Sequence, residues 1–69
     1  MDKYGIGDRV KEARNAKGWN QPELAERMGV STQTVGNIER GAKGTKLSNF
    51  IKLCEILEVS ADYLLFGKK

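Results

Sequence analysis

Two amide side chains, Gln33 and Asn37, are the residues of this chain best suited to recognise a ligand through paired hydrogen bonds. They stand four positions apart in a predicted helix over residues 32–40, so they share one face of it. Gln and Asn can each bond an adenine edge at two points in the major groove of DNA. Val35 and Ile38 fall on another side of this helix and would anchor it to a core. The pattern therefore favours a helix that displays amides to a groove lined with bases.

The alternative is a polar helix face that is simply solvated. Helical geometry predicts an outward stripe made of Gln33, Gly36, Asn37 and Arg40. This stripe has no acidic residue over two turns, and Lys43 and Lys46 follow it directly. Lysines at that place could neutralise phosphates. We therefore expect the stripe to face double-stranded DNA.

The composition of the 69-residue chain argues against several classes of function. One cysteine and no histidine leave neither a disulfide within the chain nor a usual zinc site. The sequence holds no nucleophile–base pair and no glycine-rich phosphate loop, so we expect neither an enzyme nor a cofactor. No run approaches the roughly 20 apolar residues of a membrane-spanning helix, so we expect no membrane partner. A free thiol and no recognisable signal peptide predict a cytoplasmic protein.

Charge is unevenly distributed along the chain. The formal net charge of +3 comes from 12 basic and 9 acidic residues. Between residues 40 and 54 the only charged residues are Arg40, Lys43, Lys46 and Lys52, whereas residues 53–66 are net acidic. This distribution suits a polyanion on one face, although charge alone is equally compatible with an ordinary solvated surface.

Helical signals cover the chain, and no strand-like alternation interrupts them. We expect a single all-α domain over residues 1–69, with helices at 6–17, 21–28, 32–40, 47–57 and 61–66. Asn20, Ser31 and Ser60 are predicted N-caps, each preceded by an apolar residue that can pack onto the following helix. Asn20 also has Glu23 three positions later, which completes a variant of the capping box.

The predicted helix at 47–57 is apolar around most of its circumference, which predicts a central and buried position. Cys54 on this helix is expected to be a small core residue and not a nucleophile. Leu65 and Phe66 in the last helix allow two interpretations. Either they close the core, or they stay exposed and form a dimer interface.

A specific pattern of residues runs through all five predicted helices. It consists of Arg9, Arg14, Leu47, Leu57 and the segments 18–21, 23–25, 29–31, 38–41 and 59–64. From residue 6 to about residue 66 the chain thereby resembles the Cro/repressor-type helix-turn-helix domain, the family of phage repressors and xenobiotic-response-element regulators. The resemblance implies a compact five-helix, lambda-repressor-like fold whose second and third helices form the helix-turn-helix.

The resemblance also implies roles for individual residues. Base edges would be contacted by Thr32, Gln33 and Asn37. The phosphate backbone would be contacted by Gln21, Thr34, Lys43, Thr45, Lys46 and Arg14. Gln21 has an alternative role as a buttress for a glutamine of the third helix. Arg14 would also pair with Glu39, tying the first helix to the end of the third.

By the same resemblance, the protein would be a sequence-specific repressor that binds a palindromic operator as a homodimer, without a metal. The alternative is a protein-interaction module with the same fold, such as an antitoxin or a regulator-binding domain. Two positions depart from the family pattern. Gly36 stands inside the recognition helix where a larger residue is usual, and Glu58 stands where a glycine often follows the fourth helix.

Overall fold

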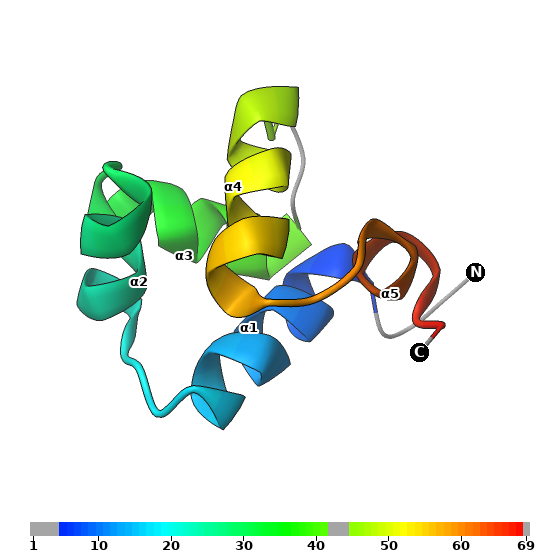
Figure 1. Cartoon of the computed structure of the whole chain (residues 1–69). Helices are drawn as coiled ribbons and strands as arrows, with labels where there is room; N and C mark the ends of the chain where they lie inside the picture. The colour runs from blue at the N-terminus through cyan, green and yellow to red at the C-terminus, as the bar shows by residue number, and fades with distance from the viewer. Residues whose placement is uncertain (1–4, 42–44, 69) are drawn as a thin grey trace.

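The structure is a computed structural model that describes residues 5–41 and 45–68. These residues form five helices and no strand, as predicted: α1 (Ile6–Ala16), α2 (Gln21–Met28), α3 (Thr32–Gly41), α4 (Leu47–Leu57) and α5 (Ala61–Phe66) (Figure 1). Two ends differ by one residue from the prediction. Lys17 is the C-cap of α1 instead of its last residue, and α3 includes Gly41.

The predicted N-caps define the beginnings of three helices. Asn20 Oδ1 accepts a hydrogen bond from the Glu23 amide at 2.9 Å, and Glu23 Oε1 accepts one from the Asn20 amide at 2.8 Å. Ser31 Oγ accepts a bond from the Thr34 amide at 3.1 Å, and Ser60 Oγ accepts one from the Tyr63 amide at 3.0 Å. Each bond satisfies an amide that has no partner within the helix.

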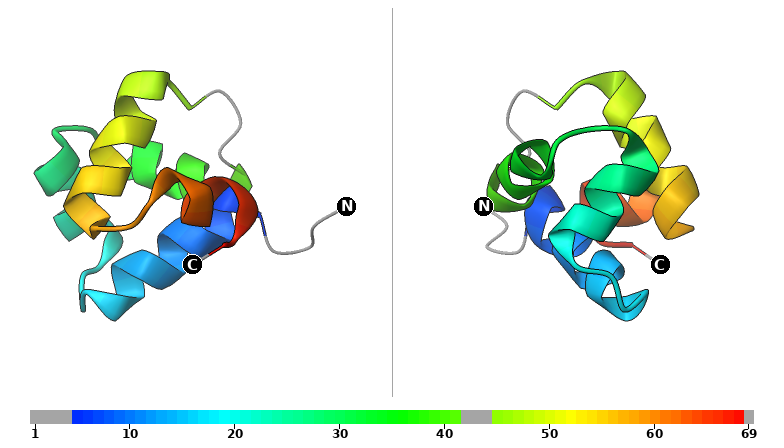
Figure 2. Two further views of the ribbon diagram at one scale, coloured as in Figure 1. Left: turned by 45° about the vertical axis from the view of Figure 1, so that its right-hand side comes forward. Right: turned by 90° about the vertical axis from the view of Figure 1, so that its left-hand side faces the viewer.

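All five helices contribute to one apolar core. The buried apolar residues are Val10, Ala13, Leu24, Ala25, Met28, Val35, Ile38, Leu53, Leu57 and Leu64. α1 packs against α3, α4 and α5, while α2 packs against α3 and α4. α2 and α5 lie at opposite ends of the bundle, as the views in Figures 1 and 2 show. Burial of each large aliphatic side chain contributes about 1.5–3 kcal/mol, so a domain of this size depends on nearly all of them.

The predicted burial of α4 around most of its circumference is wrong. α4 does pack against α1, α2 and α5, but it buries only Leu53 and Leu57 fully. Leu47 is 73% exposed and Ile51 is 50% exposed. Cys54 is partly buried against the core, where it was expected. The apolar circumference therefore supplies both a core face and an exposed apolar face.

α4 ends where it was predicted to end, although Glu58 follows it. Glu58 adopts the left-handed conformation, with φ of +58°, that glycine often supplies at this place. Its carboxylate pairs with Lys17 at the end of α1. The ammonium of Lys17 lowers the pKa of Glu58. This ion pair joins the ends of α1 and α4. It forms although the left-handed backbone conformation of Glu58 is unfavourable for a residue with a side chain.

Candidate nucleic-acid interface

A tight turn sets the angle between α2 and α3. Gly29 has φ of +73°, a left-handed conformation that ends α2. The Val30 amide then donates a hydrogen bond back to the Ala25 carbonyl at 3.0 Å. Ser31 follows as the N-cap of α3. Three residues therefore reverse the chain between the two helices, and Val30 packs against the core beside them.

The apolar residues of α3 determine which of its side chains face outward. Val35 is 1% exposed and Ile38 is 4% exposed, so this side of the helix is held in the core. Thr32, Gln33 and Asn37 are exposed, as helical geometry requires. These three residues, predicted to read bases, thus lie on the solvent side of α3.

Gly36 departs from the predicted outward stripe because it is buried. The Arg40 side chain covers it: a Cβ added to Gly36 would lie 3.3 Å from Arg40 Nη1. The same guanidinium donates a hydrogen bond to Asn37 Oδ1. The exposed face of α3 therefore presents Arg40 and Asn37 joined to each other.

A buried ion pair holds α3 to the first two helices. Arg14 Nε lies 2.6 Å from Glu39 Oε2, and Arg14 Nη2 lies 3.1 Å from Glu39 Oε1. Gln21 Nε2 donates to the same Glu39 Oε1 at 3.0 Å. Arg14 Nη1 donates to the Trp19 carbonyl at 2.7 Å. Glu39 therefore receives hydrogen bonds from α1 and from the first residue of α2.

Arg14 and Gln21, which were both predicted to contact phosphates, use their side chains in these hydrogen bonds. Arg14 is 7% exposed and its guanidinium already donates to Glu39 and Trp19. Arg14 therefore makes the pair with Glu39 that was expected from the sequence, and its contact with a phosphate stays a prediction. Gln21 is half-buried and uses its amide on Glu39, so it buttresses an acid of α3 and not the expected glutamine.

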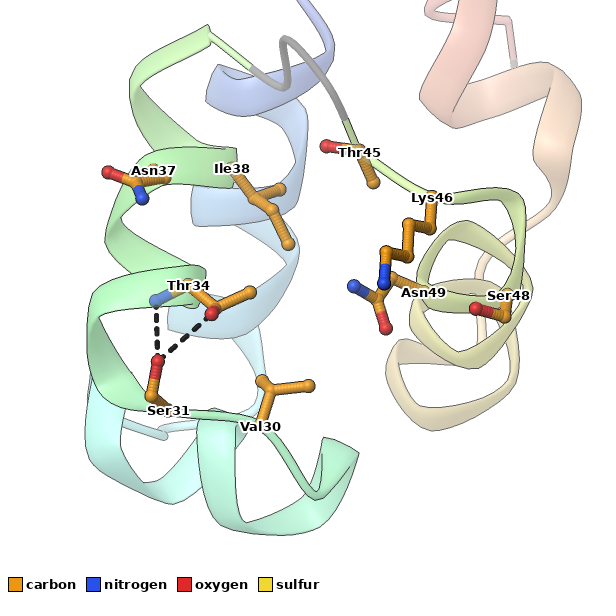
Figure 3. A pocket seen from close by; sticks show the side chains of 9 residues that line it. All are labelled: Val30, Ser31, Thr34, Asn37, Ile38, Thr45, Lys46, Ser48 and Asn49. Carbon is orange, nitrogen blue, oxygen red and sulfur yellow. Dashed lines mark hydrogen bonds between the residues drawn. The ribbon is translucent and has the colours of Figure 1, made fainter.

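A cleft of about 520 Å³ separates the N-terminal half of α3 from the beginning of α4. Figure 3 shows Ser31, Thr34 and Asn37 along one side, with Lys46 and Asn49 facing them from the other. Thr34 Oγ1 lies 2.9 Å from Ser31 Oγ. The Thr45 hydroxyl oxygen is buried and has no hydrogen-bond partner. Both walls of the cleft are thus lined by polar groups able to bond a ligand.

Lys46 is exposed and is the N-cap residue of α4. The first amides of a helix are free to bond an anion, and the helix dipole favours negative charge there. Lys43, the other predicted phosphate contact in this segment, lies outside the described residues. The cleft thus brings predicted residues of α3 together with a lysine and a helix N-terminus.

Three polar residues of α4, two of which line this cleft, were not among the predicted site residues. Ser48 and Asn49 line the cleft from the first turn of α4. Lys52 Nζ donates to the Met28 carbonyl at 3.2 Å, which ties α4 to the end of α2. The polar Ser48–Asn49 pair directly after Lys46, in an otherwise apolar helix, is the signal that could have revealed the first two.

Among the described residues there is neither a cluster of potential metal ligands nor a helix that could cross a membrane. Residues 5–41 and 45–68 contain no group of three or more potential metal ligands. Burial raises the pKa of the Cys54 thiol, which makes it a poor nucleophile. No helix within the same ranges has the length and apolar character needed to cross a bilayer.

The tight turn, the buried anchors and the exposed third helix together define a helix-turn-helix domain. The sequence profile described as "Helix-turn-helix" matches residues 10–64. This chain belongs to the Cro/C1-type helix-turn-helix family.

Similar proteins include a prophage-derived regulator and an antitoxin. An uncharacterized HTH-type transcriptional regulator of Bacillus subtilis, the SPbeta prophage-derived YonR, is 39% identical over 62 residues, covering 90% of this chain and 57% of YonR. Antitoxin HipB of Escherichia coli K12 is 34% identical over 55 residues, covering 80% of this chain and 62% of HipB. The chain therefore spans less than two thirds of the length of either relative.

A solved structure with the same fold is that of the P22 c2 repressor in complex with synthetic operator 9T. It aligns with a TM-score of 0.85 and 30% identity, covering 93% of this chain and 97% of that chain. The five-helix arrangement is thus shared over nearly the full length of both chains.

Proposed function

We propose that this protein is a sequence-specific transcriptional repressor that inserts α3 into the major groove of double-stranded DNA. The observation that carries the proposal is the exposed face of α3, which displays Thr32, Gln33 and Asn37. The acid of this helix, Glu39, is buried in its ion pair, so the exposed face is free of negative charge. The fold shared with an operator-bound P22 c2 repressor supports the same role.

The cleft beside α3 has the chemistry of a phosphate-binding site. We assign Thr34, Thr45 and Lys46 to the backbone of the DNA, together with Lys43 from the segment outside the described residues. The first amides of α4 would add donors, because they have no partner within the helix. These contacts would fix the orientation of α3, while its amides supply the sequence preference.

The apolar face of α4 supports a homodimer. A groove of about 350 Å³ bordered by α1, α3, α4 and α5 is lined by Ile6, Ile38, Thr45, Leu47, Phe50, Leu53 and Leu65. Leu47 and Phe66 are 73% and 64% exposed, and contiguous exposed apolar surface often marks a protein–protein contact. We assign this surface to a second copy of the chain. A two-fold dimer would read two half-sites about 34 Å apart, which makes the operator palindromic.

Selection of bound sequences from a pool of random duplexes tests the proposal. We expect a two-fold symmetric site with half-site centres about 10–10.5 base pairs apart. Sedimentation equilibrium should show a dimer, and Phe66→Glu should shift it towards monomer. A single unpaired half-site together with a monomeric protein would contradict the dimer and leave DNA binding in place.

Two substitutions separate base contacts from phosphate contacts. Gln33→Ala should relax the preference at one operator position by about 1–3 kcal/mol. Lys46→Ala should weaken binding to all sequences alike and reduce the salt dependence by about one unit of log–log slope. Lys11→Ala is the matched control, because Lys11 is exposed on α1 outside the cleft. An unaltered slope for Lys46→Ala would place Lys46 away from the backbone.

The similarity to antitoxin HipB supports a second candidate, a protein-interaction module that uses the apolar groove to bind a different protein. A gel-shift titration with random duplex at low salt distinguishes the two. A DNA-binding protein associates with any duplex and releases it as salt rises. A module that acts only through protein contacts would show neither effect.

A further inference from the structure

Gly36 and Arg40 are in contact on α3, and neither belongs to the proposed base-reading residues. Gly36 is buried although its neighbours Gln33 and Asn37 are exposed. A Cβ built on Gly36 would lie 3.3 Å from Arg40 Nη1, 3.8 Å from Nη2 and 3.9 Å from Cζ. The missing side chain at Gly36 thus leaves room for the guanidinium to lie against the helix.

From this position Arg40 reaches the amide of Asn37. Its Nη2 donates a hydrogen bond to Asn37 Oδ1. A guanidinium carries donors and no acceptor, so only the oxygen of the amide can face it. The oxygen of Asn37 is therefore turned towards Arg40, and its NH₂ group is left to meet a ligand.

The positive charge of Arg40 is available on this face. Arg40 is exposed, and within residues 5–41 and 45–68 no carboxylate pairs with it. The nearest acid along the chain, Glu39, is held by Arg14 on the buried side of α3. The guanidinium thus has donors to spare beyond its bond to Asn37.

We infer that Arg40 is a specificity-determining residue that acts with Asn37 to present an excess of hydrogen-bond donors for reading guanine. An isolated asparagine selects adenine by donating to N7 and accepting from the N6 amino group, which requires its amide oxygen. Arg40 occupies one of the two lone pairs of that oxygen and adds several donors of its own, and guanine presents the two acceptors N7 and O6 to match them. This inference rests on the proposed function and names the base read at this position.

Duplex selection with three variants tests the inference. Wild-type protein should select a G·C pair at one position of each half-site. Arg40→Lys keeps the charge but loses the planar fork, so the preference for guanine over adenine there should fall roughly 5- to 150-fold. Gly36→Ala should reduce it much less, because a Cβ 3.3 Å from Arg40 Nη1 shifts the flexible guanidinium by only a few tenths of an ångström. Gly41→Ala is the matched control, since a Cβ there meets nothing within 4 Å.

A role for Arg40 at a phosphate predicts a different result. Arg40→Lys would then keep every base preference, and Arg40→Met would weaken all sequences alike while lowering the salt slope by about one. That outcome overturns the inference and leaves the proposed function standing. Failure of the wild-type protein to bind any duplex overturns both. Thermal unfolding followed by circular dichroism verifies that each variant is folded.

Discussion

Replacing Glu39 with glutamine should remove a large share of the free energy of unfolding. The Glu39 carboxylate receives three hydrogen bonds, at 2.6 and 3.1 Å from Arg14 and at 3.0 Å from Gln21. The side chains of Arg14 and Glu39 are only 9% and 4% exposed, so water cannot replace the lost partner. Glutamine keeps the shape but turns an N–H towards these donors and leaves the Arg14 charge uncompensated.

Breaking one half of a buried ion pair costs about 3–5 kcal/mol. At roughly 0.05–0.15 kcal/mol per residue, a 69-residue domain has only about 3–10 kcal/mol of unfolding free energy. Glu39→Gln should therefore leave the domain marginal or unfolded at room temperature. Glu26→Gln makes the same chemical change at an exposed site of α2 and should stay within about 0.5 kcal/mol of wild type.

Urea unfolding followed by Trp19 fluorescence measures this loss, since the Trp19 carbonyl is bonded to Arg14. With a slope of about 1 kcal/mol per molar urea, a loss of 3 kcal/mol lowers the midpoint by roughly 3 M. The double variant Arg14→Met, Glu39→Met should lose less unfolding free energy than the sum of the losses in the two single variants, because an apolar replacement of both residues removes both buried charges. A Glu39→Gln variant within about 0.5 kcal/mol of wild type, or strictly additive losses, would refute the reasoning.

Two further outcomes follow from the packing of α1. Gly7→Ala places a Cβ 2.4 Å from the Glu39 carbonyl oxygen, so α1 and α3 must separate at a cost of about 1–3 kcal/mol, measured by urea unfolding against Gly41→Ala. A Gly7→Ala loss no larger than that of Gly41→Ala would contradict the close approach. The Lys17 ammonium lowers the pKa of Glu58 in the folded protein. The ion pair therefore stabilises the fold fully at a pH above the unperturbed glutamate pKa of about 4.3. This stabilisation is lost as the pH falls through the lower pKa of the folded state. The melting temperatures of wild type and Lys17→Met should therefore converge in acid, and a constant difference from pH 7 to pH 3 would exclude the pair as its source.

The local organisation of this protein can be read from its sequence. Asn20, Ser31 and Ser60 marked three helix starts, because a capping side chain bonds an amide only three residues away. Gly29 marked the turn, and the period of Val35 and Ile38 oriented α3. The exposure of Gln33 and Asn37 followed from that period. The all-α class followed from helical signals without strand-like alternation.

The tertiary structure decided what depends on distant groups and on side-chain conformation. Periodicity counted Gly36 as outward, yet it is buried because the long Arg40 side chain folds over it. The apolar surface of α4 predicted burial, yet Leu47 and Ile51 stay exposed because a five-helix domain has too few neighbours to cover every side. The pair of Arg14 with Glu39 was expected, but only the meeting of α1, α2 and α3 shows how deeply it is buried and that Gln21 joins it. The first outcome depends on the conformation of one long side chain and the other two depend on which helices meet in space, and a hydrophobic pattern specifies neither.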